Sequence, residues 1–373
     1  MAGIYLHIPF CKQACTYCDF HFSTTFDKYR GELVVSIKKE LEERVVYLKA
    51  QPIESIYFGG GTPSLLEKVE LKELLSTIYS RFDVKKNVEI TLEANPDDIS
   101  EIKLKSWKSA GINRLSIGLQ SFLQDDLDWM NRAHTAEESV SAVKLAKNFG
   151  FALTVDLIYG LPNRNIHDWE DNINKLITLD PEHISAYCLT IENNTILKHK
   201  VTKGEIIPAT EAEQASQFML LLSLLKKARY EQYEISNFCK RDRYSLHNSN
   251  YWKGVHYLGV GPSAHSFDGE TRRWNVANNQ KYIKGIDTKA DYFEVETLSN
   301  KDKFNELIMT GLRTVWGVDL KALKQFDLSS EDFENQIALF KDAGLLVQDK
   351  NTISLTDKGR LQADYIASQL FVI

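Results

Sequence analysis

The sequence predicts an α/β protein whose first half forms a parallel sheet and whose last part is mostly helical. Through the first half, short runs rich in Ile, Leu, Val and Tyr alternate with longer amphipathic stretches, which is typical of βαβ units. Right-handed crossovers wind such a series into an open sheet or a curved, barrel-like one, and the strands expected here are fewer than the eight of a full barrel. The alternation then stops, and helices with a short hairpin end the chain.

The first half contains the more regular pattern. The expected strands are Gly3–Pro9, Ser55–Phe58, Glu89–Ala94, Arg114–Leu119, Leu153–Ile158 and His183–Leu189. The expected helices between them are Tyr29–Leu48, Leu65–Ser80, Ser100–Ala110, Ala136–Asn148 and His167–Thr178. The first helix has the clearest signal, because Leu33, Ile37, Leu41 and Val45 are four residues apart and form one apolar stripe.

The second half is organised differently. It begins with a long helix at Ala209–Arg229, a strand at Tyr230–Cys239 and a loop-rich, aromatic region from Lys240 to about Tyr292. The expected tail contains helices near Lys303–Val315, Leu320–Gln325 and Glu331–Ala343, a hairpin at Leu345–Leu355 and a last helix from Thr356. This order is that of a winged-helix-like module, which we expect to serve packing rather than DNA binding, because acidic residues are plentiful. We expect three domains, at 1–205, 206–295 and 296–373.

Composition excludes several classes of protein. The 373 residues include 45 Lys+Arg and 51 Asp+Glu, a net charge of −6, so the chain lacks the basic surface of a typical nucleic-acid binder. No uninterrupted apolar run reaches the length of a membrane span, and the N-terminus lacks the basic and apolar regions of a signal peptide. We therefore expect a cytoplasmic protein that is not an integral membrane protein.

Three of the five cysteines lie close together directly after the first strand. Cys11, Cys15 and Cys18 have the spacing Cx3Cx2C, whereas Cys188 and Cys239 are isolated, so a disulfide framework is not expected. A structural zinc site needs four ligands, and here His7 or His21 would have to complete it. An iron–sulfur cube held by three cysteines would leave one iron open to another ligand. The spacing thus predicts metal or redox chemistry.

Polar residues recur at the ends of the expected strands, where the active sites of such barrels lie. The second strand is followed by Gly59–Pro63 (GGGTP), whose glycines let backbone N–H groups approach a ligand. The next three strands end near Glu93, Gln120 and Asp156, and acidic residues at such places can accept hydrogen bonds from ribose. Arg132 could bind a carboxylate with two hydrogen bonds. Each residue alone fits a capping or surface role, but their recurrence indicates one site.

The sequence around the cysteines, GIYLHIPFCKQACTYCDF, resembles the radical S-adenosylmethionine (SAM) superfamily. It is most similar to the oxygen-independent coproporphyrinogen III oxidase group and, within it, to the HemW-type haem chaperones. The resemblance implies a partial (β/α)6 barrel in which Cys11, Cys15 and Cys18 bind a [4Fe-4S] cluster whose fourth iron binds SAM. The family motifs place SAM contacts at Tyr5, Gly60, Gly61, Thr62, Glu93, Gln120, Arg132 and Asp156, and an aromatic over the cluster or adenine at Tyr17.

Two functions compete within that group. The oxidases carry a further cysteine where this chain has Phe20, and an extension ahead of the first strand, which starts here at about Gly3. The chaperone branch carries an HNxxYW motif, which matches residues 247–252 and makes His247 the expected haem ligand. His247 could instead make a structural hydrogen bond, and His21, His256 and His265 are competing ligands.

The resemblance therefore implies a chaperone that carries haem as cargo to acceptor proteins, respiratory enzymes among them. Oxidative decarboxylation of coproporphyrinogen III is the alternative function, and a radical enzyme acting on another substrate is a third.

Overall fold

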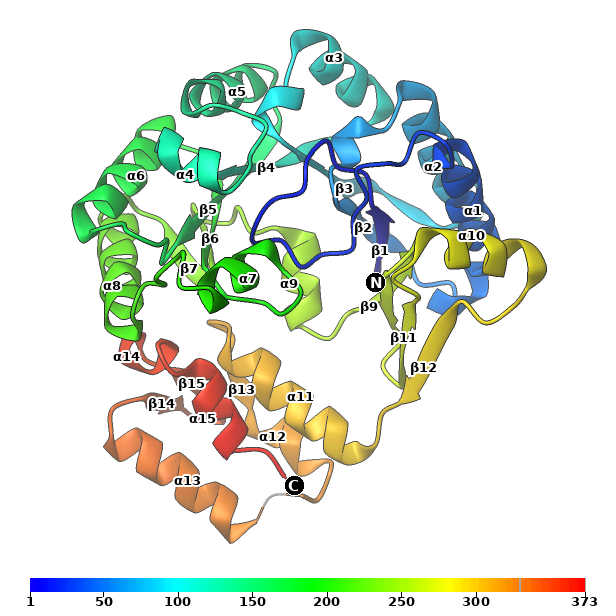
Figure 1. Ribbon diagram of the computed structural model, residues 1–373. Helices are drawn as coiled ribbons and strands as arrows, with labels where there is room; N and C mark the ends of the chain where they lie inside the picture. The colour runs from blue at the N-terminus through cyan, green and yellow to red at the C-terminus, as the bar shows by residue number, and fades with distance from the viewer. Residues whose placement is uncertain (329, 373) are drawn as a thin grey trace.

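The structure, a computed structural model, describes residues 1–328 and 330–372. Its centre is a run of parallel strands that lie side by side in sequence order: β1 (Ala2–Ile8), β2 (Ile53–Gly60), β3 (Val84–Ala94), β4 (Arg114–Gln120), β5 (Ala152–Tyr159) and β6 (His183–Cys188). The sheet curves around an interior (Figure 1). Its outer face is covered by helices α1 (Arg30–Glu43), α2 (Lys68–Arg81), α3 (Glu101–Ala110), α5 (Ala136–Asn148), α6 (Ile166–Leu179) and α8 (Glu211–Lys227). The expected α/β class is confirmed.

The alternation of side chains along β1 explains why it forms a strand here. Ile4, Leu6 and Ile8 are fully buried in the same core as the apolar stripe of α1. Burial of each such side chain contributes about 1.5–3 kcal/mol. The stripe ends earlier than the sequence predicted, because α1 stops at Glu43 and Val45 begins a separate 3-10 turn, η1 (Val45–Leu48).

The second half contains more strands than the sequence predicted. The expected strand at Tyr230–Cys239 is a hairpin of β7 (Glu231–Glu234) and β8 (Asn237–Cys239), of which β8 pairs with β6. The expected loop region contains α9 (Leu246–Trp252), β9 (His256–Val260), β10 (His265–Phe267), β11 (Thr271–Asn275) and α10 (Asn279–Thr288), and β12 (Phe293–Thr297) follows. Within the described residues the sheet has twelve strands, in the order β12-β11-β10-β9-β1-β2-β3-β4-β5-β6-β8-β7.

The pairing of β9 with β1 is the most important of these additions. β9 runs parallel to β1 from Ala2↔His256 to Leu6↔Val260, so β1 has a hydrogen-bonded neighbour on both sides. The turn back into β10 needs glycine at position 259, because a Cβ there would lie 1.9 Å from the carbonyl oxygen of His265.

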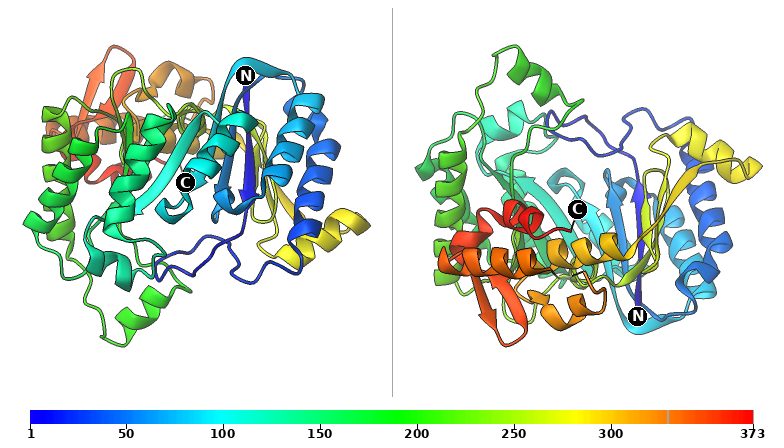
Figure 2. Two further views of the ribbon diagram at one scale, coloured as in Figure 1. Left: turned by 90° about the horizontal axis from the view of Figure 1, so that it is seen from above. Right: turned by 90° about the horizontal axis from the view of Figure 1, so that it is seen from below.

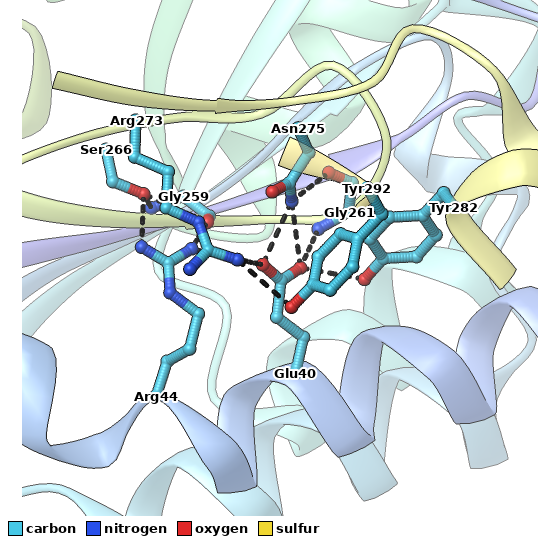
Figure 3. Close-up of polar contacts among 9 residues, drawn as sticks. All are labelled: Glu40, Arg44, Gly259, Gly261, Ser266, Arg273, Asn275, Tyr282 and Tyr292. Atoms are coloured by element: carbon cyan, nitrogen blue, oxygen red, sulfur yellow. Dashed lines mark hydrogen bonds and ion pairs between the residues drawn. The ribbon is translucent and has the colours of Figure 1, made fainter. Parts of the chain in front are cut away.

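A buried ionic network ties α1 to the added strands (Figure 3). The carboxylate of Glu40, with no solvent exposure, accepts hydrogen bonds of 2.8–3.0 Å from Arg44 Nη1, the Gly261 N–H, Asn275 Nδ2 and the Tyr282 hydroxyl. Arg273 Nη2 lies 3.6 Å from the same carboxylate. Since Arg44 also donates to the carbonyl of Gly259, the network joins residues far apart in the sequence.

The C-terminal region has a core of its own. It contains α11 (Asn300–Leu312), β13 (Val318–Asp319), α12 (Leu320–Lys324), α13 (Glu331–Asp342), β14 (Leu346–Asp349), β15 (Thr352–Leu355), α14 (Asp357–Arg360) and α15 (Ala363–Gln369). β13, β15 and β14 form a small antiparallel sheet, so the hairpin and the helical character of this module are as expected. The domain boundaries stay a prediction, and Ser329 and Ile373 of the expected module lie outside the described residues.

The C-terminal module connects the two edges of the main sheet (Figure 2). Its first helix, α11, follows directly after the edge strand β12. After α11 the chain reaches the opposite edge, where the Ile235 N–H donates to the carbonyl of Arg313 (3.1 Å) and the Val315 N–H donates to that of Tyr233 (3.0 Å). The module therefore lies across the open side of the curved sheet. No helix in the described part of the chain is long and apolar enough to cross a membrane.

Candidate cofactor site

A cavity of about 1160 Å³ lies at the carboxyl ends of the central strands. All but two of the residues that the family motifs assign to the cluster, SAM or haem line it: Cys11, Cys15, Tyr17, Cys18, Gly60, Gly61, Thr62, Glu93, Gln120, Arg132 and Asp156. The exceptions are Tyr5 and His247. The fold therefore gathers polar residues from successive strand ends into one place, as expected for a barrel-like sheet.

The cysteine loop, residues 9–23, is held by two short helices that the sequence did not predict. After α4 (Gln124–Trp129), the carbonyl of Met130 accepts from the Thr16 N–H at 3.1 Å. From α7 (Ile196–Thr202), the Leu197 N–H donates to the carbonyl of Thr16 at 2.8 Å. Lys12 forms ion pairs with Asp97 (2.5 Å) and Asp98 (2.6 Å). These hydrogen bonds and ion pairs within the protein position the cysteine loop.

The three thiols are free and face the same cavity. Burial raises the pKa of Cys11 to about 11 and that of Cys18 to about 12, so these groups become thiolates at neutral pH only beside a strong positive charge. Two donors point at sulfur: Thr62 Oγ1 lies 3.6 Å from Cys11 Sγ and Arg132 Nη1 lies 3.4 Å from Cys15 Sγ. Such hydrogen-bond donors stabilise the thiolate that forms when a bound cation favours loss of the thiol proton.

The zinc alternative fits this geometry poorly. Among the described residues, no three His, Cys, Asp or Glu side chains converge on a point that could hold one metal ion. His7 has both ring nitrogens occupied, by the Tyr5 hydroxyl (3.2 Å) and the carbonyl of His21 (2.9 Å). His21 Nε2 is paired with Asn279 Oδ1 at 2.7 Å. A cube needs no such convergence, because each thiolate binds a different iron.

The glycine loop after β2 packs closely against neighbouring parts of the protein. A Cβ at Gly60, where φ is +109°, would lie 2.6 Å from the His7 ring, and one at Gly61 would lie 2.7 Å from the carbonyl oxygen of Phe10. The Gly61 N–H donates to the carbonyl of Ile8 (3.0 Å) and the Gly60 N–H to Glu93 (3.1 Å). These two N–H groups therefore already have protein acceptors, and contact of Gly60 and Gly61 with SAM stays a prediction.

Two half-buried carboxyl groups and one guanidinium line the cavity. Burial raises the pKa of Glu93 to about 7 and that of Asp156 to about 6, although Glu93 accepts a 2.8 Å bond from the Tyr57 hydroxyl. Arg132 Nη2 donates to Asn95 Oδ1 and to the carbonyl of Gly118, while its buried Nε has no partner among the described residues. The carboxyl groups can therefore accept hydrogen bonds from hydroxyl or ammonium groups of a ligand, and the guanidinium can donate a hydrogen bond to an anion.

Tyr5 and His247 do not line the cavity. α9 lies inside the ring of strands (Figure 1). His247 is 2% exposed; its Nδ1 is paired with Ser55 Oγ and its Nε2 with the Tyr251 hydroxyl, each at 2.9 Å. Its ring stacks on Tyr57 at 4.9 Å, and Tyr5 lies beside the same tyrosine at 6.0 Å.

No histidine lines the cavity among the residues that the structure describes. His247 has the contacts of a structural histidine, and it could bind haem iron only if one of its two hydrogen bonds broke. Haem ligation by His247 stays a prediction.

The C-terminal module provides one wall of the cavity, which the sequence did not predict. Arg313, Arg360, Asp364 and Tyr365 line this wall. No local pattern marks these residues, because only the packing of the module against the sheet brings them to the cavity.

Comparison with known proteins agrees with this architecture. The family model described as "Radical SAM superfamily" matches residues 5–176, and that described as "HemN C-terminal domain" matches residues 298–361. The chain is 32% identical to heme chaperone HemW of Bacillus subtilis (strain 168) over 97% of each chain. It is 34% identical to heme chaperone HemW of Haemophilus influenzae over 96% of this chain and 95% of the relative. The solved structure of coproporphyrinogen III oxidase (HemN) from Escherichia coli has a TM-score of 0.87 at 21% identity, covering 100% of this chain and 90% of that one, which shows a shared fold.

The curved parallel sheet, with a three-cysteine loop after its first strand and polar residues at the following strand ends, is that of a radical SAM protein. The sequence identity to relatives from several bacteria, which extends over almost the whole chain, identifies the family within this superfamily. It belongs to the HemW family.

Proposed function

We propose that this protein is a haem chaperone that holds a [4Fe-4S] cluster and SAM and delivers haem to acceptor proteins. The observation that carries the proposal is the cavity itself. Three free thiols lie in one part of it, and the remaining volume extends to the C-terminal module. The relatives named heme chaperone, at 32% and 34% identity over almost the whole chain, support the choice of haem.

The cluster would be held by Cys11, Cys15 and Cys18. It would supply an iron with an open coordination position for the amino and carboxylate groups of SAM. The protein's own part is to position the loop, through Lys12 and the backbone of Thr16, and to donate hydrogen bonds to sulfur from Thr62 and Arg132. These contacts restrict the loop before any cofactor arrives.

The residues around the thiols suit SAM. Glu93 and Asp156 are half-buried carboxyl groups that ligand hydroxyl or ammonium donors would stabilise in the charged form. The unpartnered Nε of Arg132 could donate to a carboxylate. Gly60, Gly61, Thr62 and Gln120 would shape the pocket, and Tyr17 would cover the cluster or adenine. Tyr5 would act indirectly, through its hydrogen bond to His7.

Decarboxylation of coproporphyrinogen III is the alternative function. Phe20 occupies the position of the additional cysteine of the oxidases, and its side chain lines the cavity without a sulfur. The oxidase structure shares 21% identity with this chain, whereas the chaperone relatives share more. These observations favour the chaperone. We further propose that the protein acts in the cytoplasm and that its acceptors include respiratory enzymes.

One anaerobic experiment tests the proposal. The protein is reconstituted with iron and sulfide, analysed for both, titrated with haem, and incubated with coproporphyrinogen III, SAM and reductant. We expect iron and sulfide in equal amounts, saturable haem binding and no protoporphyrinogen. Absence of iron and sulfide would refute the cluster, absence of haem binding would refute the chaperone, and protoporphyrinogen production would establish the oxidase.

A further inference from the structure

The cavity extends well beyond the cysteines. Its volume of about 1160 Å³ exceeds the range of about 300–1,000 Å³ that is typical of a site for one small molecule. The part where the C-terminal module meets the end of β6 is lined by Tyr187, Ser236, Arg313, Arg360, Asp364 and Tyr365, and we call these residues the outer lobe. The outer lobe lies where the C-terminal module meets the sheet, so its shape depends on both.

Large aromatic side chains that line the cavity are exposed. Tyr187 is 44% exposed and Tyr365 is 56% exposed, and Phe20, on the cysteine loop, is 67% exposed. When a ligand covers aromatic rings that line a concave surface and contact water, the burial of their apolar surface favours binding. A flat, mostly apolar ligand would cover several of them at once.

Two arginines of the outer lobe differ in how fully they are paired. Arg313 donates to Glu234 (3.1 and 3.2 Å) and to Asp364 (2.8 Å), so its charge is balanced within the protein. Arg360 uses only Nη1, which donates to Gln232 and, at 3.1 Å, to Asp357. Its other nitrogens have no hydrogen-bond partner among the described residues.

The surroundings of Arg360 suggest that its charge is only partly compensated. Burial lowers the pKa of Arg360, and the effect of burial outweighs the opposing effect of Asp357. Asp357 is itself mostly exposed to water and so screens the guanidinium weakly. An anionic group next to the free nitrogens would supply the missing charge and accept charge-assisted hydrogen bonds.

We propose that the outer lobe holds the carboxylate-bearing edge of a flat tetrapyrrole, with Arg360 donating to a propionate and Tyr187 and Tyr365 packing against the ring. This inference rests on the proposed function and names the place of the cargo. It also accounts for the absence of histidine from the cavity wall in the described residues: edge and face contacts hold the ring without a bond to iron. Cargo held in this way leaves the iron open to a ligand from the acceptor protein.

The test compares Arg360→Gln with Lys358→Gln, which removes one charge from an exposed residue of the same helix. Full-length protein, reconstituted anaerobically, is titrated with haem and with haem dimethyl ester, which lacks the carboxylate charges. We expect the parent and the Lys358→Gln variant to bind haem about tenfold more tightly than the ester, a difference of about 1.4 kcal/mol. We expect Arg360→Gln to lose that preference while binding the ester normally.

Tyr365→Ala provides a second test that does not depend on the stability of the Arg360 variant. Because Tyr365 is exposed, the variant should fold normally, and we expect it to weaken haem and ester binding equally. An unchanged preference of Arg360→Gln for haem over the ester, or unchanged affinities in Tyr365→Ala, would show that the outer lobe is not the haem-binding site. The proposed chaperone function would then still stand. Failure of the parent protein to bind haem would overturn both the proposed function and the outer lobe as the haem-binding site.

Discussion

Removal of the Glu40 carboxylate should destabilise the protein strongly, although Glu40 is far from the cavity. In Glu40→Ala, the guanidinium groups of Arg44 and Arg273 would lose their shared buried counter-charge, and Asn275 and Tyr282 would lose an acceptor (Figure 3). Burial and the nearby Arg273 already lower the pKa of Arg44 in the intact network. Breaking a buried ion pair from one side costs about 3–5 kcal/mol, and we expect a loss in that range.

Urea unfolding followed by tryptophan fluorescence measures this loss. Glu40→Gln removes the same charge but keeps one acceptor oxygen, so it should lose less stability than Glu40→Ala. Glu43→Ala is the control, because Glu43 lies on the same helix but pairs with Lys289 at the surface, where an ion pair contributes about 0–1 kcal/mol. If Glu40→Ala were no less stable than Glu43→Ala, the network would contribute nothing to holding α1 against the added strands, and our reasoning would be refuted.

Three further predictions concern the site. Cys15→Ala should abolish the visible absorption of the reconstituted cluster while Cys188→Ala, at another cavity cysteine, keeps it; equal spectra would refute the ligand assignment. His247→Ala should lower the free energy of unfolding by about 1–3 kcal/mol, because Ser55 and Tyr251 lose a buried partner. Haem affinity tests the ligand prediction: weaker haem binding by the folded variant would support His247 as the haem ligand, and unchanged affinity would refute it. Glu93 has a pKa of about 7 in the folded protein and 4.5 as its ordinary value, so the cluster-free protein should lose up to about 3 kcal/mol as the pH rises between these values. Glu93→Gln should remove that part of the loss in thermal unfolding, and an identical pH profile would contradict the prediction.

The central strands and the cysteine loop could be predicted because each is encoded locally. Alternating apolar residues mark β1, and its buried set of Ile4, Leu6 and Ile8 follows from that pattern. The residues that end the strands could then be assigned to one place, because parallel strands end on the same side of a sheet. The structure does bring Glu93 and Asp156 together in one cavity.

The strands of the second half could not be predicted in the same way. β9 and β10 have few residues, and their partners lie far away in the sequence, so neither length nor periodicity marks them. The surroundings of His247 could not be predicted for a related reason. A histidine among aromatic residues has the same local sequence whether it faces a ligand or, as here, pairs with Ser55 inside the barrel. The outer lobe depends on Arg360, which comes from a separate module.

The position of β1 in the middle of the sheet has a consequence for biosynthesis. Cys11, Cys15 and Cys18 are translated long before His256–Val260, the segment that gives Ala2–Leu6 their second hydrogen-bonded neighbour. Contacts between such distant segments form slowly, because a long loop must close first. The cysteine loop follows this strand, so its thiols are translated well before the sheet around them is complete, and they stay open to oxidation during that interval.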